Sequence, residues 1–579
     1  MPRTSFHRLL LLVTIAGLLA GCAGRATPAT PTAPTAAPTG VPAPTSTPAP
    51  TGAPTALPAE PVQPIRGRPT GTDGYSWWND AVFYEIFVRS FADSGRDGVG
   101  DFNGIIEKLD YLNDGDPATT TDLGVTGLWL MPIHPSPSYH GYDVTDYYAV
   151  NPQYGTLQDF RRLLEEAHRR GIRVLIDLVI NHSSRQHDWF QQSRSPDSPY
   201  RDWYRWLPAD PGRAGWRASS NGAYYGYFDA GMPDLNYENP AVSAKMLDVV
   251  RFWLQDVGVD GFRVDGARYL IEEGDSLADS AATHAWYKDF HQFYKSLNPD
   301  ALVVGEAWTD TTAAAKYVNG QEFDLVFDFD LARGFVKGVQ LRQTADMRAA
   351  LAINEKAFPP GQFAAFLTNH DQDRVASQLG GSVPRAKLAA TLLLTAPGVP
   401  FIYYGEEIGM TGAKPDPLIR APMQWNADED AGFTTSSPWQ PANADFPQIN
   451  VAAQSDDPDS LLAAYRALIR ARADHAALRV GATYRIKTGS PNVYAVLRAS
   501  KNETILIVVN LSKKPLENVT LSLETGPLTG GQTYPLAPIL ASAAFAPITA
   551  NGQGGFTDYL PLPVLPPESA FVLQLAAGG

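Results

Sequence analysis

Several residues that could carry out acid–base or nucleophilic chemistry stand at the ends of short apolar runs of this 579-residue sequence. Carboxylates can act as nucleophiles, general bases and, when protonated, general acids, and an arginine beside a carboxylate keeps it ionised. Such a group can work only if the fold brings the ends of these runs to one place. The group consists of Arg263, Asp265, Glu306 and Asp371, with His182 and His370 beside them.

The apolar runs that carry these residues alternate with amphipathic helical patterns, such as 157–170, 241–257, 282–297 and 386–394. Eight such runs predict a parallel (β/α)8 barrel, in which functional side chains lie at the carboxyl ends of the strands. Arg263 and Asp265 are two residues apart, so both side chains point to the same side of their strand. The predicted strands are 81–87, 127–132, 172–177, 261–265, 302–308, 325–330, 364–371 and 399–406.

Two segments do not follow the barrel pattern. Residues 183–235 are rich in Trp, Tyr, Asp and Ser and lack a helical period, which predicts a small domain inserted after the third strand. Short alternating runs near the end of the chain predict a C-terminal β-sandwich over residues 478–579. The barrel itself is then expected to comprise residues 75–182 and 236–477.

The N-terminal segment has the features of a bacterial lipoprotein signal. Arg3 and Arg8 precede a short apolar run that ends at Cys22, the one cysteine of the chain, with small residues beside it. We expect residues 1–22 to be the signal and Cys22 to be lipidated; the alternative is an ordinary secretory signal. Residues 23–74 are rich in Pro, Thr and Ala, which predicts an extended spacer. The folded part would then lie outside the cytoplasm, anchored to the cell membrane only through this lipid.

Composition excludes several classes of protein. Hydrophobic residues make up 44% of the chain, so a large core can form and global disorder is excluded. The net charge of −15 and the pI of about 5.1 argue against a nucleic-acid partner. Because one cysteine cannot form an internal disulfide, an exported protein of this sequence depends on its core for stability.

The motifs around these strands resemble the conserved regions of the α-amylase family, glycoside hydrolase family 13, over about residues 75–575. The second and eighth strand motifs, 124–132 and 398–407, match that family, as do the ends of strands three, four, five and seven. The segment Met232-Pro-Asp-Leu-Asn236 is similar to the version in the subfamily intermediate between oligo-1,6-glucosidases and neopullulanases. The resemblance implies an enzyme that cleaves α-glucans with retention of configuration.

The resemblance also implies a role for each polar residue. Asp265 would be the nucleophile, with Arg263 keeping it ionised, and Glu306 the general acid and base, for which its pKa must be raised. Asp371 would hold the sugar through its hydroxyl groups. The remaining substrate contacts would be made by His182, His370 and Tyr142, the last as a stacking platform for the sugar ring.

An acidic loop after the first strand has the spacing of a calcium-binding loop. Its positions one, five, seven and nine would supply ligands, and Gly98 permits the turn. It resembles the first-loop calcium site of the oligo-1,6-glucosidase and neopullulanase groups, although Gly95 stands where a ligand is usual; the alternative is a solvated acidic turn. We expect a structural calcium here, apart from the residues that do chemistry. The expected ligands are Asp93, Asp97, the carbonyl of Val99, and Asp101.

A second calcium site of α-amylases is not predicted. That site uses the Asn of the third-strand motif, here Asn181, and the His of a Lys-His pair after the nucleophile. In this sequence the pair reads Arg268-Tyr269, so the histidine is missing.

Three functions fit these motifs to different degrees. The first is a retaining hydrolase of starch, maltodextrins or related oligosaccharides, which we expect to act as a monomer. The second is an exo-acting α-glucosidase, an oligo-1,6-glucosidase or a glucanotransferase on the same scaffold; the segment Arg420-Ala-Pro-Met-Gln-Trp425 resembles the oligo-1,6-glucosidase side. The third is a non-catalytic glycan-binding lipoprotein. It has no need of Asp265, Glu306 and Asp371 together, which argues against it.

The lipid anchor leads to a first prediction. Cys22→Ser should release the protein from membranes into the soluble exported fraction, because the lipid is the only hydrophobic anchor left once the signal is removed. Detergent phase partitioning of wild type and variant measures this directly. Partitioning that the substitution leaves unchanged would contradict the lipoprotein assignment.

Overall fold

The structure is a computed structural model that describes residues 69–274, 276–540 and 543–576. The predicted signal, the lipidation site Cys22 and spacer residues 23–68 lie outside the described residues. Within the described part of the chain, no helix combines the length and the apolar character needed to cross a bilayer.

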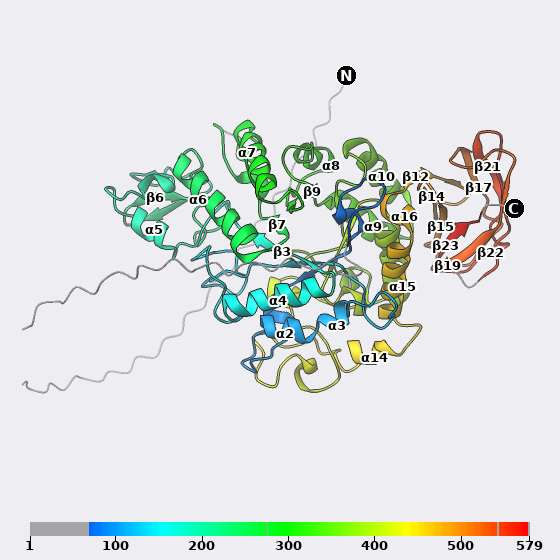
Figure 1. The fold of residues 1–579 in the computed structure, drawn as a ribbon, viewed down its shortest axis with the longest axis horizontal. Helices are drawn as coiled ribbons and strands as arrows, with labels where there is room; N and C mark the ends of the chain where they lie inside the picture. Colours follow the sequence, from blue (N-terminus) through cyan, green and yellow to red (C-terminus); the bar gives the residue numbers. More distant parts are fainter. Residues whose placement is uncertain (1–68, 275, 541–542, 577–579) are drawn as a thin grey trace, which may run out of the picture. The chain divides into compact units, whose positions relative to one another are not determined.

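Eight parallel strands form the barrel predicted from the apolar runs (Figure 1). Their order in the sheet is β10-β11-β1-β2-β3-β7-β8-β9, and a parallel bridge between Phe327 and Ala364 joins the two ends. The prediction of a (β/α)8 barrel is therefore confirmed. The strands are β1 (Phe83–Ile86), β2 (Gly127–Leu130), β3 (Arg173–Leu178), β7 (Gly261–Val264), β8 (Leu302–Gly305), β9 (Leu325–Val326), β10 (Ala364–Ala365) and β11 (Val399–Tyr403).

The barrel interior is packed with side chains and is not a channel. Aromatic and aliphatic residues from seven of the eight strands and their flanks form one buried cluster, including Phe83, Trp129, Leu175 and Phe401. The rings of Phe83 and Phe401 stack with centroids 4.6 Å apart. Such filling by large side chains is how a barrel of eight strands becomes a solid core. It leaves the polar residues to the strand ends.

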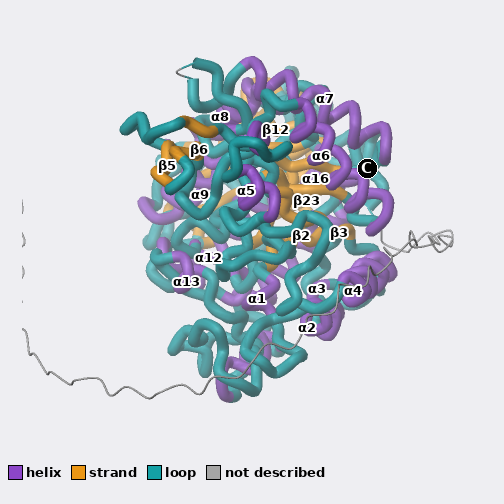
Figure 2. Tube along the Cα trace, turned by 90° about the vertical axis from the view of Figure 1, so that its left-hand side faces the viewer, coloured by secondary structure: helices purple, strands orange, loops and turns teal. Residues whose placement is uncertain are grey.

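Helices cover the outside of the strands: α4 contacts β3, and α6 and α7 lie side by side (Figure 2). Helix α4 begins with a capping box, in which Thr156 and Asp159 satisfy each other's backbone N–H groups. The predicted helix 241–257 is α6 followed by a π-helical turn (Phe252–Val257), which ends at Gly258 with a φ of 96°. The main helices are α4 (Leu157–Arg169), α6 (Pro240–Arg251), α7 (Ala281–Leu297), α9 (Phe329–Leu341), α10 (Ala345–Ala357), α12 (Val383–Thr395) and α15 (Leu461–Asp474).

The segment after β3 forms a small unit of its own. It contains a three-stranded antiparallel sheet in the order β4 (Trp206–Leu207), β6 (Gly222–Tyr225), β5 (Trp216–Ser219). It also contains a short helix, α5 (Asp188–Ser193), which the sequence pattern does not predict because six residues are too few to show a helical period. A bridge of His182 with Asp234 and the bond from the N–H of Leu235 to the carbonyl of Asn181 tie this segment to the end of β3.

The C-terminal segment forms a β-sandwich. A five-stranded sheet contains β12 (Ala482–Arg485), β14 (Val493–Ala499), β15 (Thr504–Asn510), β23 (Ser569–Leu575) and β19 (Leu536–Leu540). A three-stranded sheet contains β13 (Lys487–Thr488), β17 (Leu521–Thr525) and β21 (Gly554–Tyr559). Inward residues of both sheets, such as Leu506 and Phe556, belong to one buried cluster, so the sheets pack face to face.

Two buried arginines join the sandwich to the barrel without a carboxylate partner among the bonds of the described residues. Arg472 of α15 donates to the carbonyls of Leu394, Ala396, Gly398 and Leu478. Arg498 of β14 donates to the carbonyls of Thr395 and Gly481. Because burial disfavours the charged form, the pKa of Arg472 falls to about 9 and that of Arg498 to about 10. Both remain charged near neutral pH and hold the loop between α12 and β11.

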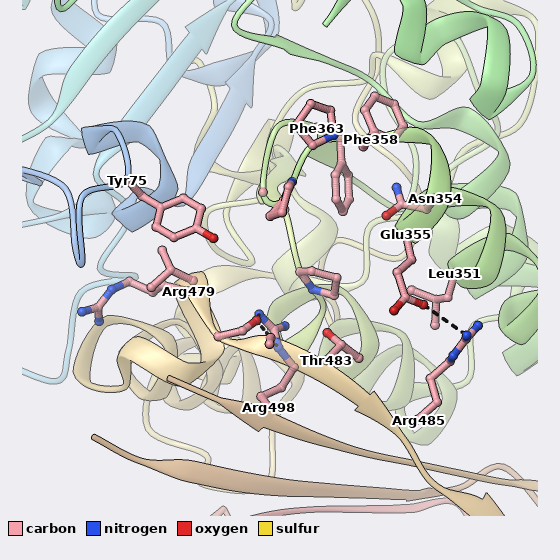
Figure 3. A pocket seen from close by; sticks show the side chains of 18 residues that line it. Tyr75, Leu351, Asn354, Glu355, Phe358, Phe363, Arg479, Thr483, Arg485 and Arg498 are labelled. Atoms are coloured by element: carbon pink, nitrogen blue, oxygen red, sulfur yellow. Dashed lines mark hydrogen bonds and ion pairs between the residues drawn. The ribbon is translucent and has the colours of Figure 1, made fainter. Parts of the chain in front are cut away.

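A cavity of about 390 Å³ lies in the same seam (Figure 3). Phe358, Phe363 and Tyr75 form part of its wall, close to the amino-terminal ends of the barrel strands. Of its charged residues, Arg485 pairs with Glu355 at 3.2 Å and Arg479 with Asp80 at 3.0 Å, while Arg498 bonds to backbone carbonyls. The cavity thus belongs to the joint between barrel and sandwich, at the opposite end from the carboxyl ends of the strands.

Candidate active site

The carboxyl ends of the barrel strands bring the predicted polar residues together. Arg263 lies in β7 and Asp265 directly after it, while Glu306 follows β8 and Asp371 lies in the loop after β10. The parallel register places Arg263 beside Val304, so the ends of β7 and β8 are level. The four residues predicted from separate apolar runs therefore share one opening, as the barrel geometry requires.

The guanidinium of Arg263 is the centre of this site. Its Nη1 donates to Asp265 Oδ1 at 2.9 Å, and its Nη2 donates to Glu306 Oε2 at 2.5 Å. The side chain of Arg263 is 1% exposed, so it has no solvent to stabilise its charge. A buried cation of this kind is tolerated only when carboxylates and hydrogen bonds surround it. The arginine thus holds two carboxyl groups, one by each terminal nitrogen.

A third carboxyl group, Asp177, was not among the predicted site residues. It lies in β3 directly beside Arg263 in the parallel register, and Arg263 Nη1 donates to both of its oxygens at 2.8 and 2.9 Å. Burial raises the pKa of Asp177 to about 7, against the opposing effect of the guanidinium. The sequence does contain a signal for Asp177, because it is a charged residue inside an apolar run. Its partner Arg263 is likewise a charged residue inside the apolar run of the next barrel strand.

Glu306 has the protonation behaviour expected of a general acid. Its side chain is 11% exposed, and burial is the main cause that raises its pKa to about 7. The charges of Asp265 and Asp371 raise it further, while Arg263 acts in the opposite direction. A carboxyl group that keeps its proton near neutral pH can donate it to a leaving group.

The residues around Asp371 keep its carboxylate ionised. Burial alone would raise its pKa, but His370 and the guanidinium of Arg420 outweigh burial, and the pKa lies below its ordinary range. Arg420 Nη2 donates to Asp371 Oδ1 at 2.8 Å, and Arg420 Nε donates to the carbonyl of His370 at 3.0 Å. Arg420 was recognised as part of a motif but was not given a role, because it follows Asp371 by 49 residues in the chain.

His370 and Tyr142 lie together beside Asp371. The hydroxyl of Tyr142 is 2.6 Å from His370 Nε2, and the two rings are nearly parallel with centroids 5.6 Å apart. His370 Nδ1 is bonded to Glu85 of β1, a buried residue that the sequence prediction also missed. Burial holds the pKa of His370 well below its ordinary value. Both ring nitrogens of His370 are thus engaged within the protein, so direct contact with a sugar would require it to exchange its bond to Tyr142.

His182 is in a different situation. It is 2% exposed, and within the described residues its ring nitrogens bond to no side chain; the backbone of Tyr142 lies close enough to one of them to affect its pKa. Burial lowers its pKa, so the ring is neutral at neutral pH and can offer one N–H donor. A buried polar group without a partner is costly, which makes His182 well suited to bond a ligand in the opening.

The acidic loop after β1 is closed by its own hydrogen bonds. Asp101 accepts four of them, from the N–H and hydroxyl of Ser94 and from the N–H groups of Gly95 and Gly104. Asp93 accepts bonds from the N–H groups of Arg96 and Gly98. No group of three or more His, Cys, Asp or Glu side chains poised to hold a metal occurs within the described ranges. A calcium ion would have to take carboxylate oxygens that now bond to N–H groups.

Comparison with known proteins agrees with this geometry. The family described as "Alpha amylase, catalytic domain" matches residues 85–481. Alpha-amylase 3 of Dictyoglomus thermophilum is 40% identical over 451 residues, covering 76% of this chain and 87% of that protein. The oligo-1,6-glucosidase of Parageobacillus thermoglucosidasius is 34% identical over 527 residues, covering 76% and 91%. The crystal structure of the α-amylase from H. orenii superposes with a TM-score of 0.74 at 39% identity, covering 86% of this chain and 99% of that one.

The raised pKa of Glu306 leads to a prediction about pH. If Glu306 donates a proton, kcat/KM should fall as pH rises through about 7, because the acid is protonated below its pKa and not above it. Glu306→Gln should remove this limb of the profile together with most activity on glucans. It should largely spare the release of fluoride from α-glucosyl fluoride, whose leaving group needs no proton. A Glu306→Gln variant with wild-type activity on maltodextrin would contradict the role.

Proposed function

The chain belongs to the α-amylase family of glycoside hydrolases, and we propose that it hydrolyses α-glucosidic bonds of starch, maltodextrins or related oligosaccharides with retention of configuration. The coverage of the family match and of the relatives supports the family; the chemistry of the opening supports the reaction. The observation that supports this proposal most directly is that Asp265 and Glu306 bond to the two terminal nitrogens of one buried guanidinium, that of Arg263.

This arrangement suits a retaining mechanism. Retention needs a nucleophile and an acid about 5–5.5 Å apart, whereas inversion needs a wider gap of about 6.5–9.5 Å to admit a water molecule. Two carboxyl groups on one guanidinium are held close together. Arg263 bonds one oxygen of Asp265 and leaves the other available to attack the anomeric carbon.

The proposed reaction proceeds in two steps. Asp265 attacks the anomeric carbon while Glu306 gives its proton to the leaving glycosidic oxygen, which forms a covalent glycosyl-enzyme. Glu306, now ionised, takes a proton from water, and the resulting hydroxide displaces Asp265 and restores both groups. Asp371, kept ionised by Arg420, accepts hydrogen bonds from the sugar hydroxyls and stabilises the positive charge of the transition state. His182 donates to the same sugar.

Aromatic rings beside Glu306 support an oligosaccharide substrate. Trp308 is 45% exposed and stacks on Phe329, with centroids 4.6 Å apart and an interplanar angle of 9°. Phe228 is 40% exposed and lies 5.4 Å from the ring of His182. Exposed flat rings next to a polar site suit sugars, which have apolar faces and polar edges. We propose that these rings bind glucose units beyond the bond that is cleaved.

The alternative activities remain open on this scaffold. An exo-acting α-glucosidase, an oligo-1,6-glucosidase or a glucanotransferase would use the same Asp265 and Glu306, and would differ in the walls of the opening and in the acceptor. The relatives named above include both an alpha-amylase and an oligo-1,6-glucosidase at similar coverage of this chain. The products released from defined substrates distinguish these activities from the proposed one.

A product profile tests the proposed function. Purified protein should convert maltoheptaose to shorter maltooligosaccharides, followed by chromatography over time, with pullulan and isomaltose as competing substrates. Asp265→Asn serves as a matched control, since it removes the nucleophile with almost no change in shape and should lose about 10³-fold or more in kcat. Release of glucose alone from the first minutes, or preferential cleavage of isomaltose, would favour the exo-acting alternatives. No cleavage of any of the three would refute the proposal.

We also propose that the protein is exported and anchored through a lipid on Cys22. The support is the sequence pattern before that residue and the Pro-, Thr- and Ala-rich spacer that follows it. An α-glucan hydrolase held outside the membrane would act on polysaccharides too large to enter the cell.

A structural calcium in the loop 93–101 is a further proposal. Its support is the spacing of Asp93, Asp97, the Val99 carbonyl and Asp101, together with the closeness of two carboxylates. A Cβ built on Gly95 would lie 3.5 Å from Asp101 Oδ2 and 3.6 Å from Asp93 Oδ1, so these oxygens flank Gly95. Oxygen ligands of this kind are those that calcium prefers, and the ion would stabilise the loop without taking part in a chemical step.

Calcium binding should raise the thermal stability of the protein. Because an ion that binds only the folded state stabilises it by mass action, the melting temperature should rise with calcium and fall with a chelator. Asp97→Ala should abolish this dependence, whereas Asp97→Asn, which keeps an oxygen to accept the N–H of Val99 at 2.9 Å, should only weaken it. A melting temperature indifferent to calcium and chelator would show that the loop is a solvated acidic turn.

A further inference from the structure

The acidic loop 93–101 lies apart from the proposed catalytic residues but is joined to their opening through a series of contacts. Its partner is a second loop, 433–439, which follows the last barrel strand by about 30 residues. Asp93 N donates to the carbonyl of Phe433, and the hydroxyl of Thr434 donates to Asp93 Oδ2 at 2.6 Å. The two loops are therefore joined through backbone and side chain, although more than 330 residues separate them.

Gly98 lets the two loops approach closely. Its φ is 89°, and a Cβ at this position would lie only 2.0 Å from the carbonyl oxygen of Ser437. The carbonyl of Gly98 accepts the N–H of Trp439 at 2.9 Å. Any side chain at Gly98 would separate the loops, so the acidic loop sets the position of the Trp439 backbone.

The indole of Trp439 reaches toward the opening by two routes. Its Nε1 donates to the hydroxyl of Ser90 at 3.0 Å, and this hydroxyl donates to the carbonyl of Arg420 at 2.6 Å. Its ring stacks on Tyr139, with centroids 5.4 Å apart and an interplanar angle of 21°. The ring of Tyr139 in turn lies 5.9 Å from the guanidinium carbon of Arg420. Both routes end at Arg420.

We infer that Trp439 is a positioning residue for Asp371, acting through Ser90, Tyr139 and Arg420. Arg420 is the arginine that donates to Asp371 Oδ1 and to the His370 carbonyl. Ser90 fixes its backbone, Tyr139 lies against its guanidinium, and Trp439 contacts both. The acidic loop thereby controls where the carboxylate that receives the sugar hydroxyls stands. This inference rests on the proposed function, because it assigns Asp371 a task in that reaction.

Two variants separate positioning from simple packing. Trp439→Phe keeps an aromatic ring for Tyr139 but has no N–H for Ser90, and Ser90→Ala removes the hydroxyl between Trp439 and Arg420. Both should lower kcat on maltodextrin by about tenfold while KM changes less than about twofold, because a misplaced group loses interactions made in the transition state. All assays are made well below the melting temperature of each variant, with circular dichroism confirming that it is folded.

Trp425→Phe is the matched control. Trp425 also donates its indole N–H to a group in the protein, the carbonyl of Phe91 at 2.8 Å, and packs edge to face on a neighbouring ring, but its bond does not lead to Arg420. Because Trp425 is buried and Trp439 is half-buried, Trp425→Phe should lower the melting temperature at least as much, yet leave kcat within about twofold of wild type. Equal loss of kcat in Trp425→Phe and Trp439→Phe would show that the effect is general destabilisation.

A double-mutant cycle identifies Arg420 as the target. Arg420→Lys removes the two bonds that the guanidinium makes to Asp371 and to the carbonyl of His370. In this background Trp439→Phe should lower kcat by less than about twofold, because Trp439 no longer has a guanidinium to position. The same tenfold cost in both backgrounds would overturn the inference, as would wild-type kcat in Trp439→Phe and Ser90→Ala. A wild-type protein that cleaves no α-glucoside would instead overturn the proposed function, and this inference with it.

Discussion

One buried guanidinium sets the chemistry of the opening. Arg263 carries a single positive charge but contacts three carboxyl groups, those of Asp177, Asp265 and Glu306. One charge cannot neutralise three in a site of low dielectric, so protons must remain on part of the group. Burial accordingly raises the pKa of Asp177 and of Glu306 to about 7. Glu306 thus keeps its proton because of burial and the neighbouring carboxylates, although it bonds to the same guanidinium as Asp265, the proposed nucleophile.

The barrel supplies this constraint because its strands are in register. Asp177 and Arg263 are partners in neighbouring strands, and Arg263 and Val304 are partners in the next pair. The level strand ends place Asp265 and Glu306 on the same rim without any loop having to carry them. Loops bring only the outer groups, Asp371 and Arg420, whose separate ion pair keeps Asp371 ionised. Rigid elements therefore position the groups proposed to break the bond, and longer segments position the groups proposed to hold the sugar.

Much of this architecture could be predicted from the sequence. All eight barrel strands coincide with apolar runs, because buried parallel strands need them on both faces. Asp265, Glu306 and Asp371 could be picked out because each stands at the end of a predicted strand, although the seventh strand ends at Ala365 and Asp371 lies in the loop that follows it. Asp177 and Glu85 were missed because a lone charge inside an apolar run has no visible partner in the sequence. Strand register brings Arg263 to Asp177, and the barrel brings His370 to Glu85. The contact of Trp439 with Ser90 spans 349 residues, and no local pattern encodes such a contact.

In the proposed mechanism, Arg263 holds Asp265 as the nucleophile and Glu306 as its proton donor, and trapping of the glycosyl-enzyme tests these roles. An α-glucosyl fluoride with an additional fluorine at C5 slows breakdown of a covalent intermediate, so the sugar stays attached to the residue that attacked. Mass spectrometry of the intact protein and of its peptides after this treatment locates the sugar. We expect one added 5-fluoroglucosyl unit, on the carboxylate of Asp265. A label on Glu306 or Asp371, or rapid turnover of the reagent by an Asp265→Asn variant, would contradict it.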